Sequence, residues 1–270
     1  GIIPAALGTQ TIGSITRPAA YCGVYGFKPS YGRISAKGVI PFSQSADHIG
    51  VLTQDIESLE LFASVLCENW KTEENISTKK PVFGVLTGKY INQADENIIK
   101  NYNKSVEYIK NQGFKTVEVD LFPDIEKINK IHRTIISYEF AEVHREWFDK
   151  YQELYRQGSV DLIEEGLKHS AEELIDAKSK QMLYRNKIED IKRKSEIDLW
   201  ISPSTTTFPP KGMATGSPLM NLPWTFIGSP TITMPIFYKD NEFPFGLQFA
   251  NSFENDELLF KFVKSINIFI

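Results

Sequence analysis

The sequence predicts an α/β fold in which a mixed, largely parallel sheet is flanked by helices. Its 270 residues are 41% hydrophobic and 24% charged, a composition typical of a globular protein with a filled core. A strand–helix–strand pattern at 82–121 indicates a βαβ unit. Three further strand-like runs precede a final amphipathic helix from about Asp256; they are 199–202, 231–234 and 245–249. Because no repeat or low-complexity linker interrupts the chain, we expect one α/β domain over residues 1–270.

The first fifty-three residues differ from the rest because glycine recurs among serines, threonines and short apolar runs. Such a composition predicts main chain that lies close to other groups, in tight turns and short strands rather than helices. Asp55 is then placed to cap the next helix. The apolar face of that helix would comprise Ile56, Leu59, Phe62 and Leu66.

The βαβ pattern rests on three local signals. The apolar run 82–86 is typical of a short buried strand. A helix with one apolar face follows, and Gly113 is placed to end it. Polar and apolar residues then alternate over 116–121, which indicates a half-exposed strand.

Residues 123–197 are expected to be mostly helical. Ser170 and Glu173 have the spacing of a capping box, which predicts a long helix from this point to about residue 197. The charges of this region are interspersed, so they indicate solvated helix faces rather than a binding tract.

Bulk properties exclude several classes of function. A net charge of -4 and a pI near 5.7 argue against a surface for nucleic acid or anionic membranes. Cys22 and Cys67 are too few for a disulfide framework or a cysteine-rich zinc site, and the four histidines lack metal-ligand spacing. We find no signal peptide or membrane-spanning run, and we expect a cytoplasmic protein without metal or cofactor.

One loop carries a pattern that suits nucleophilic catalysis. Ser14 follows Gly13 in a stretch rich in threonine and glycine, where main-chain N–H groups can turn inward and stabilise an oxyanion. A serine hydroxyl is a weak nucleophile at neutral pH and needs a base within hydrogen-bond reach. On spacing alone, an ordinary turn or helix cap explains the loop equally well.

The wider segment is more informative. Residues 6–20 read Ala-Leu-Gly-Thr-Gln-Thr-Ile-Gly-Ser-Ile-Thr-Arg-Pro-Ala-Ala. This segment resembles the signature loop of the amidase-signature family, which reads approximately G-[ST]-[DQ]-T-G-G-S followed by arginine, proline and alanine. The resemblance continues through 21–35, 38–41, 45–50 and 52–53. It returns near the end of the chain at 198–203, 221–230 and 245–249, whereas 123–197 matches only in helical character.

The resemblance implies a catalytic role for Ser14. Members of the family hydrolyse amides through a serine nucleophile, a second serine in a cis peptide and a lysine that acts as base. Matched residue by residue, the nucleophile is Ser14, and the oxyanion donors are the backbone N–H groups of Thr11, Ile12, Gly13 and Ser14. The lysine and the bridging serine lie before this point in the family, so we expect an inactive C-terminal fragment. Lys28 matches a Gly-x-Lys-Pro lysine of the family, which resembles a structural position.

Several residues depart from the family pattern or are expected to support the loop. Gln10 replaces the commoner aspartate, and Ile12 replaces a glycine that tolerates unusual dihedral angles, which puts the oxyanion site in question. Arg17 could orient an acidic substrate or pair with a buried carboxylate, and we expect the structural pair. Asp47 and Ser45 are expected to hold the loop through backbone amides.

The leading hypothesis is an amide C–N hydrolase that acts on a small linear amide. An alternative is the glutamine-hydrolysing subunit of a tRNA-dependent amidotransferase, which typically keeps aspartate at position 10 and glycine at position 12. A third hypothesis is a non-catalytic binding or scaffold protein that retains the fold. The resemblance implies that 123–197 is a helical insertion on the substrate side of the domain. This region carries no decisive signature, so the substrate cannot be deduced. A homodimer is expected if the fragment exposes apolar surface.

Overall fold

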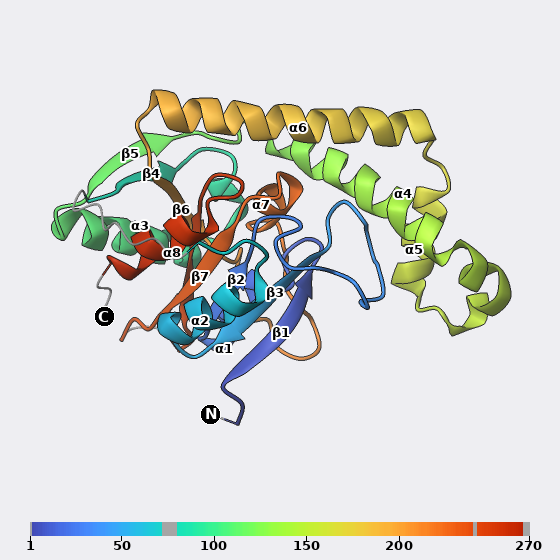
Figure 1. Ribbon diagram of the computed structural model, residues 1–270, viewed down its shortest axis with the longest axis horizontal. Coiled ribbons are helices and arrows are strands. Elements are labelled where there is room, and N and C mark those ends of the chain that lie inside the picture. Colours follow the sequence, from blue (N-terminus) through green and yellow to red (C-terminus); the bar gives the residue numbers. More distant parts are fainter. Residues whose placement is uncertain (1, 72–79, 240–241, 267–270) are drawn as a thin grey trace.

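The computed structural model describes residues 2–71, 80–239 and 242–266, and its centre is an eight-stranded sheet (Figure 1). The strands are β1 (Ala5–Gln10), β2 (Tyr25–Lys28), β3 (His48–Thr53), β4 (Val82–Leu86), β5 (Lys115–Val119), β6 (Leu199–Pro203), β7 (Thr231–Ile236) and β8 (Phe245–Ala250). They lie in the order β1-β3-β2-β7-β8-β6-β4-β5. All three strands predicted near the C-terminus are therefore present in this sheet.

The sheet is mixed and flanked by helices, as predicted, but the expectation of a largely parallel sheet is wrong. Among the described strands, five of the seven neighbouring pairs are antiparallel. Parallel pairing is restricted to β4 with β5 and β4 with β6, where helices provide the crossovers that parallel neighbours need. The predicted βαβ unit is thus the parallel part of the sheet.

Several helices begin and end close to the predicted signals, but residues 1–53, expected to form turns and short strands rather than helices, contain the helix Thr16–Cys22. The helices are α1 (Thr16–Cys22), α2 (Ile56–Leu66), α3 (Glu96–Asn111), α4 (Ile125–Tyr151), α5 (Gln157–Gly166), α6 (Ala171–Lys194), α7 (Leu222–Phe226) and α8 (Asp256–Lys264), with 3-10 turns at Ile91–Gln93 and Gln152–Leu154. The Asp55 side chain accepts from the Ser58 N–H at 2.7 Å, and Ser170 with Glu173 forms the predicted capping box. Gly113, with φ 77°, follows the last turn of α3.

Close packing against the sheet fixes the position of α1. A Cβ atom on Gly26 would lie 2.6 Å from the Cβ of Ala19, and one on Gly246 would lie 2.3 Å from the Cβ of Ala20. Only glycine on β2 and β8 therefore lets α1 approach the sheet so closely. Because the loop with Ser14 leads directly into α1, this packing also positions that loop.

The long helices of the predicted insertion form a layer beyond the sheet. Figure 1 shows α4 and α6 running side by side and extending away from the sheet, with α5 at the far end of α4. The start of α4 contacts α7 and buries Ile128, Ile131 and Ile135. Its far half forms a separate apolar cluster with α5, made of Phe140, Ala141, Leu162 and Ile163. The segment 123–197 is mostly helical, as predicted.

None of the helices in the described part of the chain is long and apolar enough to span a bilayer. The same residues contain no group of three or more His, Cys, Asp or Glu side chains that could hold a metal ion.

Candidate active site

Ser14 lies in a short loop, residues 11–15, between the end of β1 and the start of α1. Its side chain is exposed, whereas Gly13 and Ile15 on either side are buried. The first turn after the loop is closed by the Arg17 N–H, which donates to the Gly13 carbonyl at 3.1 Å. A ligand can therefore reach the Ser14 hydroxyl, while the main chain around it is anchored in the fold.

Hydrogen bonds fix the carbonyl groups of Thr11, Ile12 and Gly13 in the loop. Three successive carbonyls each accept a hydrogen bond from a group outside the loop. The donors are His132 Nε2 to Thr11 at 3.0 Å, Thr225 Oγ1 to Ile12 at 2.7 Å and the Arg17 N–H to Gly13 at 3.1 Å. In a trans peptide the C=O and the following N–H point in opposite directions. Holding these carbonyls therefore fixes the directions of the next N–H groups, those of Ile12, Gly13 and Ser14.

The N–H groups of this loop are left available. In the described part of the chain, none of the N–H groups of Thr11, Ile12, Gly13 and Ser14 donates a hydrogen bond. Main-chain donors usually have a partner in the protein or in solvent. A row of oriented, unpaired donors next to an exposed hydroxyl is the arrangement that stabilises negative charge on a ligand oxygen.

Gln10 connects the loop to the rest of the structure, and its side chain is only 1% exposed. Its Oε1 accepts from the N–H groups of Ile15 at 2.8 Å and Thr16 at 3.0 Å. Its Nε2 donates to Thr225 Oγ1 at 2.9 Å, and this hydroxyl in turn donates to the Ile12 carbonyl. An aspartate could accept the first two bonds but could not donate the third, so glutamine here also orients Thr225.

Asp47 also holds the loop in place. Its Oδ1 accepts from Thr11 Oγ1 at 2.6 Å, and its Oδ2 accepts from the N–H groups of Phe42 at 2.7 Å and Ser43 at 2.9 Å. The carboxylate thus ties the residue 42–47 loop to Thr11, the first residue of the Ser14 loop.

Ser45 was expected to bond backbone amides, but it contacts α4 instead. Its N–H donates to Glu139 Oε2 at 2.8 Å and its Oγ to Oε1 at 2.6 Å, and Lys178 on α6 lies 2.7 Å from the same carboxylate. Burial opposes ionisation of Glu139, but hydrogen bonds from Lys178, Ser43 and Ser45 outweigh burial and lower its pKa. Residues 42–47 are thereby fastened to both long helices.

The β-branched Ile12 fits the loop without backbone strain. The described non-glycine residues with positive φ are Asn69, Glu196 and Glu254, so Ile12 does not adopt the left-handed conformation that would disfavour it. Its side chain packs against the main core. Gly13 is required for space, because a Cβ there would lie 2.5 Å from Asn221 Oδ1.

Arg17 lacks the structural partner expected from the sequence. Its half-buried guanidinium makes no hydrogen bond or ion pair to any residue that the structure describes. Burial lowers the pKa of this group from its ordinary value. Arg17 lies three residues after Ser14 in the chain, in the first turn of α1, and its guanidinium has no ion-pair partner among the described residues.

Lys28 has no contact with Ser14. It is 0% exposed, and its Nζ donates to the carbonyls of Ser229 at 2.5 Å and Pro29 at 3.2 Å. Burial lowers the pKa of Lys28 to about 7 despite the nearby charge of Asp256. In the described residues no lysine, histidine or carboxylate bonds the Ser14 hydroxyl.

Sequence reasoning did not find His132 and Thr225, which hold two of the loop carbonyls. His132 is 121 residues from Thr11, and Thr225 is 213 residues from Ile12. From the sequence, His132 could be weighed only as a metal ligand. Without knowledge of the tertiary contacts, no local pattern distinguishes a core histidine or threonine from one that positions a loop.

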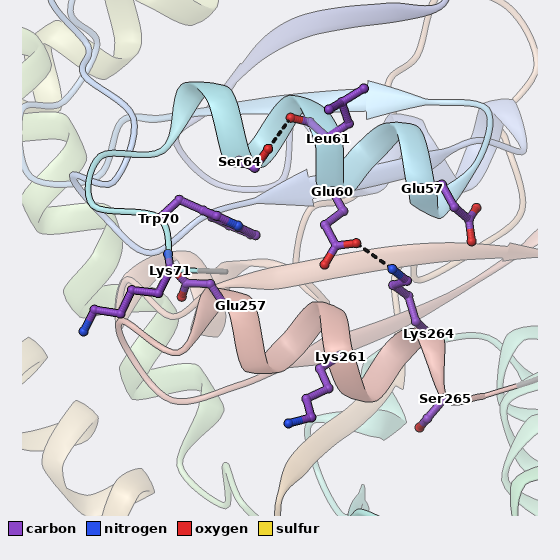
Figure 2. A pocket seen from close by; sticks show the side chains of 10 residues that line it. All are labelled: Glu57, Glu60, Leu61, Ser64, Trp70, Lys71, Glu257, Lys261, Lys264 and Ser265. Carbon is purple, nitrogen blue, oxygen red and sulfur yellow. Dashed lines mark hydrogen bonds and ion pairs between the residues drawn. The ribbon is translucent and has the colours of Figure 1, made fainter. Parts of the chain in front are cut away.

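A cleft of about 610 Å³ lies between α2 and α8 and is separate from the Ser14 loop. Figure 2 shows that Trp70 and several charged side chains line it, with Lys264 and Glu60 joined across it at 2.6 Å. None of its lining residues belongs to the loop or to α1. This cleft is therefore separate from the surroundings of Ser14.

The loop geometry and the mixed sheet together define a class of protein. The chain belongs to the Amidase family, whose sequence model matches residues 1–260. The resemblance predicted from the signature loop is thereby confirmed.

Relatives within this class can be named. The chain is 30% identical over 301 residues to a glutamyl-tRNA(Gln) amidotransferase subunit from Aliarcobacter butzleri (strain RM4018), a match that covers 96% of this chain and 66% of that protein. It is 38% identical over 131 residues to the corresponding subunit from Wolbachia pipientis wMel, covering 43% of this chain and 27% of that protein. A crystal structure of an amidase superposes with a TM-score of 0.85 at 26% identity, covering 97% of this chain and 62% of the other. The chain thus spans less than two thirds of the length of each.

Proposed function

We propose that this chain carries the nucleophile and the oxyanion site of an amide C–N hydrolase that acts on a small linear amide. One observation carries the proposal, namely that three fixed carbonyls leave the N–H groups of Ile12, Gly13 and Ser14 oriented and unpaired beside an exposed hydroxyl. Such donors stabilise a transition state only if they are oriented before the reaction begins. The Thr11 N–H, also unpaired, would be a further donor.

In the proposed reaction, Ser14 Oγ attacks the amide carbonyl carbon and loses its proton to a base. The carbonyl oxygen becomes an oxyanion that accepts from the loop N–H groups. The C–N bond then breaks, the amine leaves with a proton, and water hydrolyses the acyl ester to restore Ser14. The family to which the chain belongs uses a lysine and a bridging serine for the proton transfers.

We further propose that residues 1–270 alone hydrolyse amides slowly. No base contacts the Ser14 hydroxyl in the described residues, and a positioned base typically contributes about 10²–10⁴-fold in rate. Turnover of a simple amide should therefore be lower by about this factor than in a complete family enzyme. A rate equal to that of a complete enzyme, and lost in Ser14→Ala, would contradict this part of the proposal.

The oxyanion site can be tested without the base. Trifluoroacetone forms a tetrahedral adduct with a serine hydroxyl that an oxyanion site stabilises, and fluorine NMR detects the adduct. We expect an adduct with the wild-type chain and none with Ser14→Ala. Ser64→Ala is the matched control, because Ser64 on α2 bonds only the Leu61 carbonyl at 2.8 Å. A folded wild-type chain without an adduct would instead favour a non-catalytic binding protein.

Glutamine hydrolysis is a second candidate, favoured by the two named relatives, both amidotransferase subunits. On the sequence alone it ranks lower, because Gln10 and Ile12 replace aspartate and glycine. The structure weakens that objection, since Ile12 adopts no strained conformation and Gln10 makes bonds that aspartate could not complete. Ammonia release from glutamine that depends on partner subunits would support this candidate over a stand-alone amidase.

The homodimer expected from the sequence stays a prediction. Leu7 on β1 is 63% exposed and Ile3 before it is 64% exposed, so the edge of the sheet presents apolar surface. We propose that two copies associate through this edge. Light scattering should show a dimer that Leu7→Lys weakens, and a monomer at high concentration would contradict it.

A further inference from the structure

We propose that His132 is a positioning residue that sets the direction of the Ile12 N–H, so that α4 completes the oxyanion site from outside the nucleophile loop. The inference rests on the proposed function of that loop. It assigns a role in catalysis to the helical segment, which otherwise contributes packing and shape.

His132 is held in one orientation by its surroundings. It lies on α4 and is 0% exposed. Its ring packs edge-on against Phe226 of α7, with ring centroids 6.0 Å apart and planes at 88°. Its Nε2 lies 3.0 Å from the Thr11 carbonyl oxygen. A side chain so confined can direct a hydrogen bond with little freedom to reorient.

The hydrogen bond determines the tautomer of the imidazole. A carbonyl oxygen only accepts, so the proton must be on Nε2 of His132. The other nitrogen, Nδ1, is buried without a partner among the described residues. Burial lowers the pKa of His132 to about 4, so the ring is neutral at pH 7. A neutral ring protonated on Nε2 is the form that donates to Thr11 without burying a charge.

The effect on the loop follows from peptide planarity. Holding the Thr11 carbonyl orients the peptide plane that also contains the Ile12 N–H. The next two carbonyls have donors on α7 and α1, whereas the donor to Thr11 comes from α4. Removal of the His132 donor leaves that first plane free to rotate, so the direction of the Ile12 N–H is no longer fixed.

Two variants separate positioning from packing. His132→Phe keeps a flat ring of similar size but removes the donor. His132→Gln places an amide N–H near the former Nε2 position and therefore keeps the donor. We expect His132→Phe to weaken the trifluoroacetone adduct about 10-fold, less than the roughly 10²–10³-fold loss typical when an oxyanion donor is removed outright. His132→Gln should stay within about 3-fold of wild type because it retains the donor.

Thermal unfolding provides the contrast with a purely structural role. If His132 only fills the core, adduct formation should follow stability, and the two variants should lose it in proportion to their Tm. If His132 positions the loop, His132→Gln should recover the adduct even where its Tm stays low. An adduct equally weak in both variants, or unchanged in His132→Phe, would overturn the proposal.

Two NMR measurements do not depend on the proposed reaction. Amide proton–nitrogen spectra should show the Ile12 signal shifted or broadened in His132→Phe and restored in His132→Gln. Imidazole nitrogen shifts of the wild-type chain should show a neutral ring protonated on Nε2 at pH 7. A charged ring, a proton on Nδ1, or an unmoved Ile12 signal would overturn the positioning role. If the wild type forms no adduct but Ile12 responds as expected, the proposed function fails and the positioning stands.

Discussion

Two buried polar clusters in this molecule contain similar hydrogen-bonding groups but differ in which of those groups have partners. The loop cluster, Gln10, His132 and Thr225, holds the residues around Ser14. The lysine cluster, Lys28, Ser30 and Asp256, joins the end of β2 to the start of α8. Both clusters are almost fully shielded from solvent. The difference lies in what remains unpaired.

In the lysine cluster the buried donors form hydrogen bonds with acceptors. Lys28 donates to two carbonyls, and Asp256 accepts from the Ser30 N–H at 2.8 Å and the Ser30 hydroxyl at 2.6 Å. In the loop cluster the bonds fill carbonyl acceptors and leave the opposing N–H groups without partners. Pairing of buried donors with acceptors stabilises a fold, whereas oriented donors without partners can bind a ligand. The two clusters should therefore respond differently to substitution.

The largest effect is expected on stability, in the lysine cluster. Asp256→Ala removes a buried carboxylate that accepts from the Ser30 N–H at 2.8 Å and pairs with Arg33 at 3.6 Å, which should lower the free energy of unfolding by about 3–5 kcal/mol. Asp176→Ala is the matched control, because Asp176 pairs with Lys180 on the exposed surface of α6 and should cost under about 1 kcal/mol.

Urea unfolding would measure both changes. Under conditions where Asp256→Ala remains folded, its trifluoroacetone adduct should match wild type, because the substitution leaves the Ser14 loop intact. Similar losses of unfolding free energy in Asp256→Ala and Asp176→Ala, or loss of the adduct in folded Asp256→Ala, would contradict the distinction between the clusters.

The next effect concerns both stability and binding. Gly13→Ala adds a Cβ that would lie 2.5 Å from Asn221 Oδ1 and 3.0 Å from Pro218 Cβ. Relief of this overlap must move the loop, so we expect a loss of about 1–3 kcal/mol in the free energy of unfolding and a weaker adduct.

Gly158→Ala provides the control for that substitution. Gly158 lies in α5 with nothing within 4 Å of the added Cβ, so the change should stabilise the helix by up to about 1 kcal/mol. Denaturant titrations and fluorine NMR of both variants test the comparison. An unchanged adduct in Gly13→Ala would mean that the loop tolerates displacement and is not a preorganised site.

A third prediction concerns pH. The pKa of Lys28 is lowered by burial to about 7 in the folded chain, from an ordinary value of 10.5. Between these values the unfolded chain holds more protons than the folded chain, so stability should rise with pH, by at most about 1.4 kcal/mol per unit. The stability that neutral Lys28 contributes is fully present above pH 10.5 and is lost as pH falls toward 7. Lys28→Met should flatten this part of the stability profile measured by urea unfolding, and an identical slope in the variant would contradict the assignment.

The Ser14 loop and most elements could be located from the sequence because their signals are local. Capping residues such as Asp55 and Ser170, and the alternation that marks β5, act within a few positions. The direction of most strand pairs could not be predicted, since β2 pairs with β7, about two hundred residues later, and local periodicity does not specify partners.

The candidate site divides in the same way. Ser14 and its loop are continuous in the sequence and could be named from it. The donors that orient the loop come from α4 and α7, and only the fold brings them together. The prediction of a carboxylate partner for Arg17 was wrong for the described residues for a related reason. Tertiary packing decides which carboxylates lie near a given guanidinium.

The smallest effect is expected on ligand affinity when Arg17 is replaced. This substitution tests which ligand the unpaired N–H groups of the Ser14 loop bind. The half-buried guanidinium makes no hydrogen bond or ion pair with any described residue and follows Ser14 by three positions, so we propose that it pairs with a carboxylate on the amide substrate. A trifluoromethyl ketone with a carboxylate on a short chain should bind about 10-fold more weakly to Arg17→Gln than to wild type, a loss of about 1.4 kcal/mol. The methyl ester of the same compound, which lacks the charge, should bind both proteins alike. If acid and ester lose affinity equally, Arg17 supports the loop rather than the substrate, and its positive charge has a structural purpose like that of Lys28.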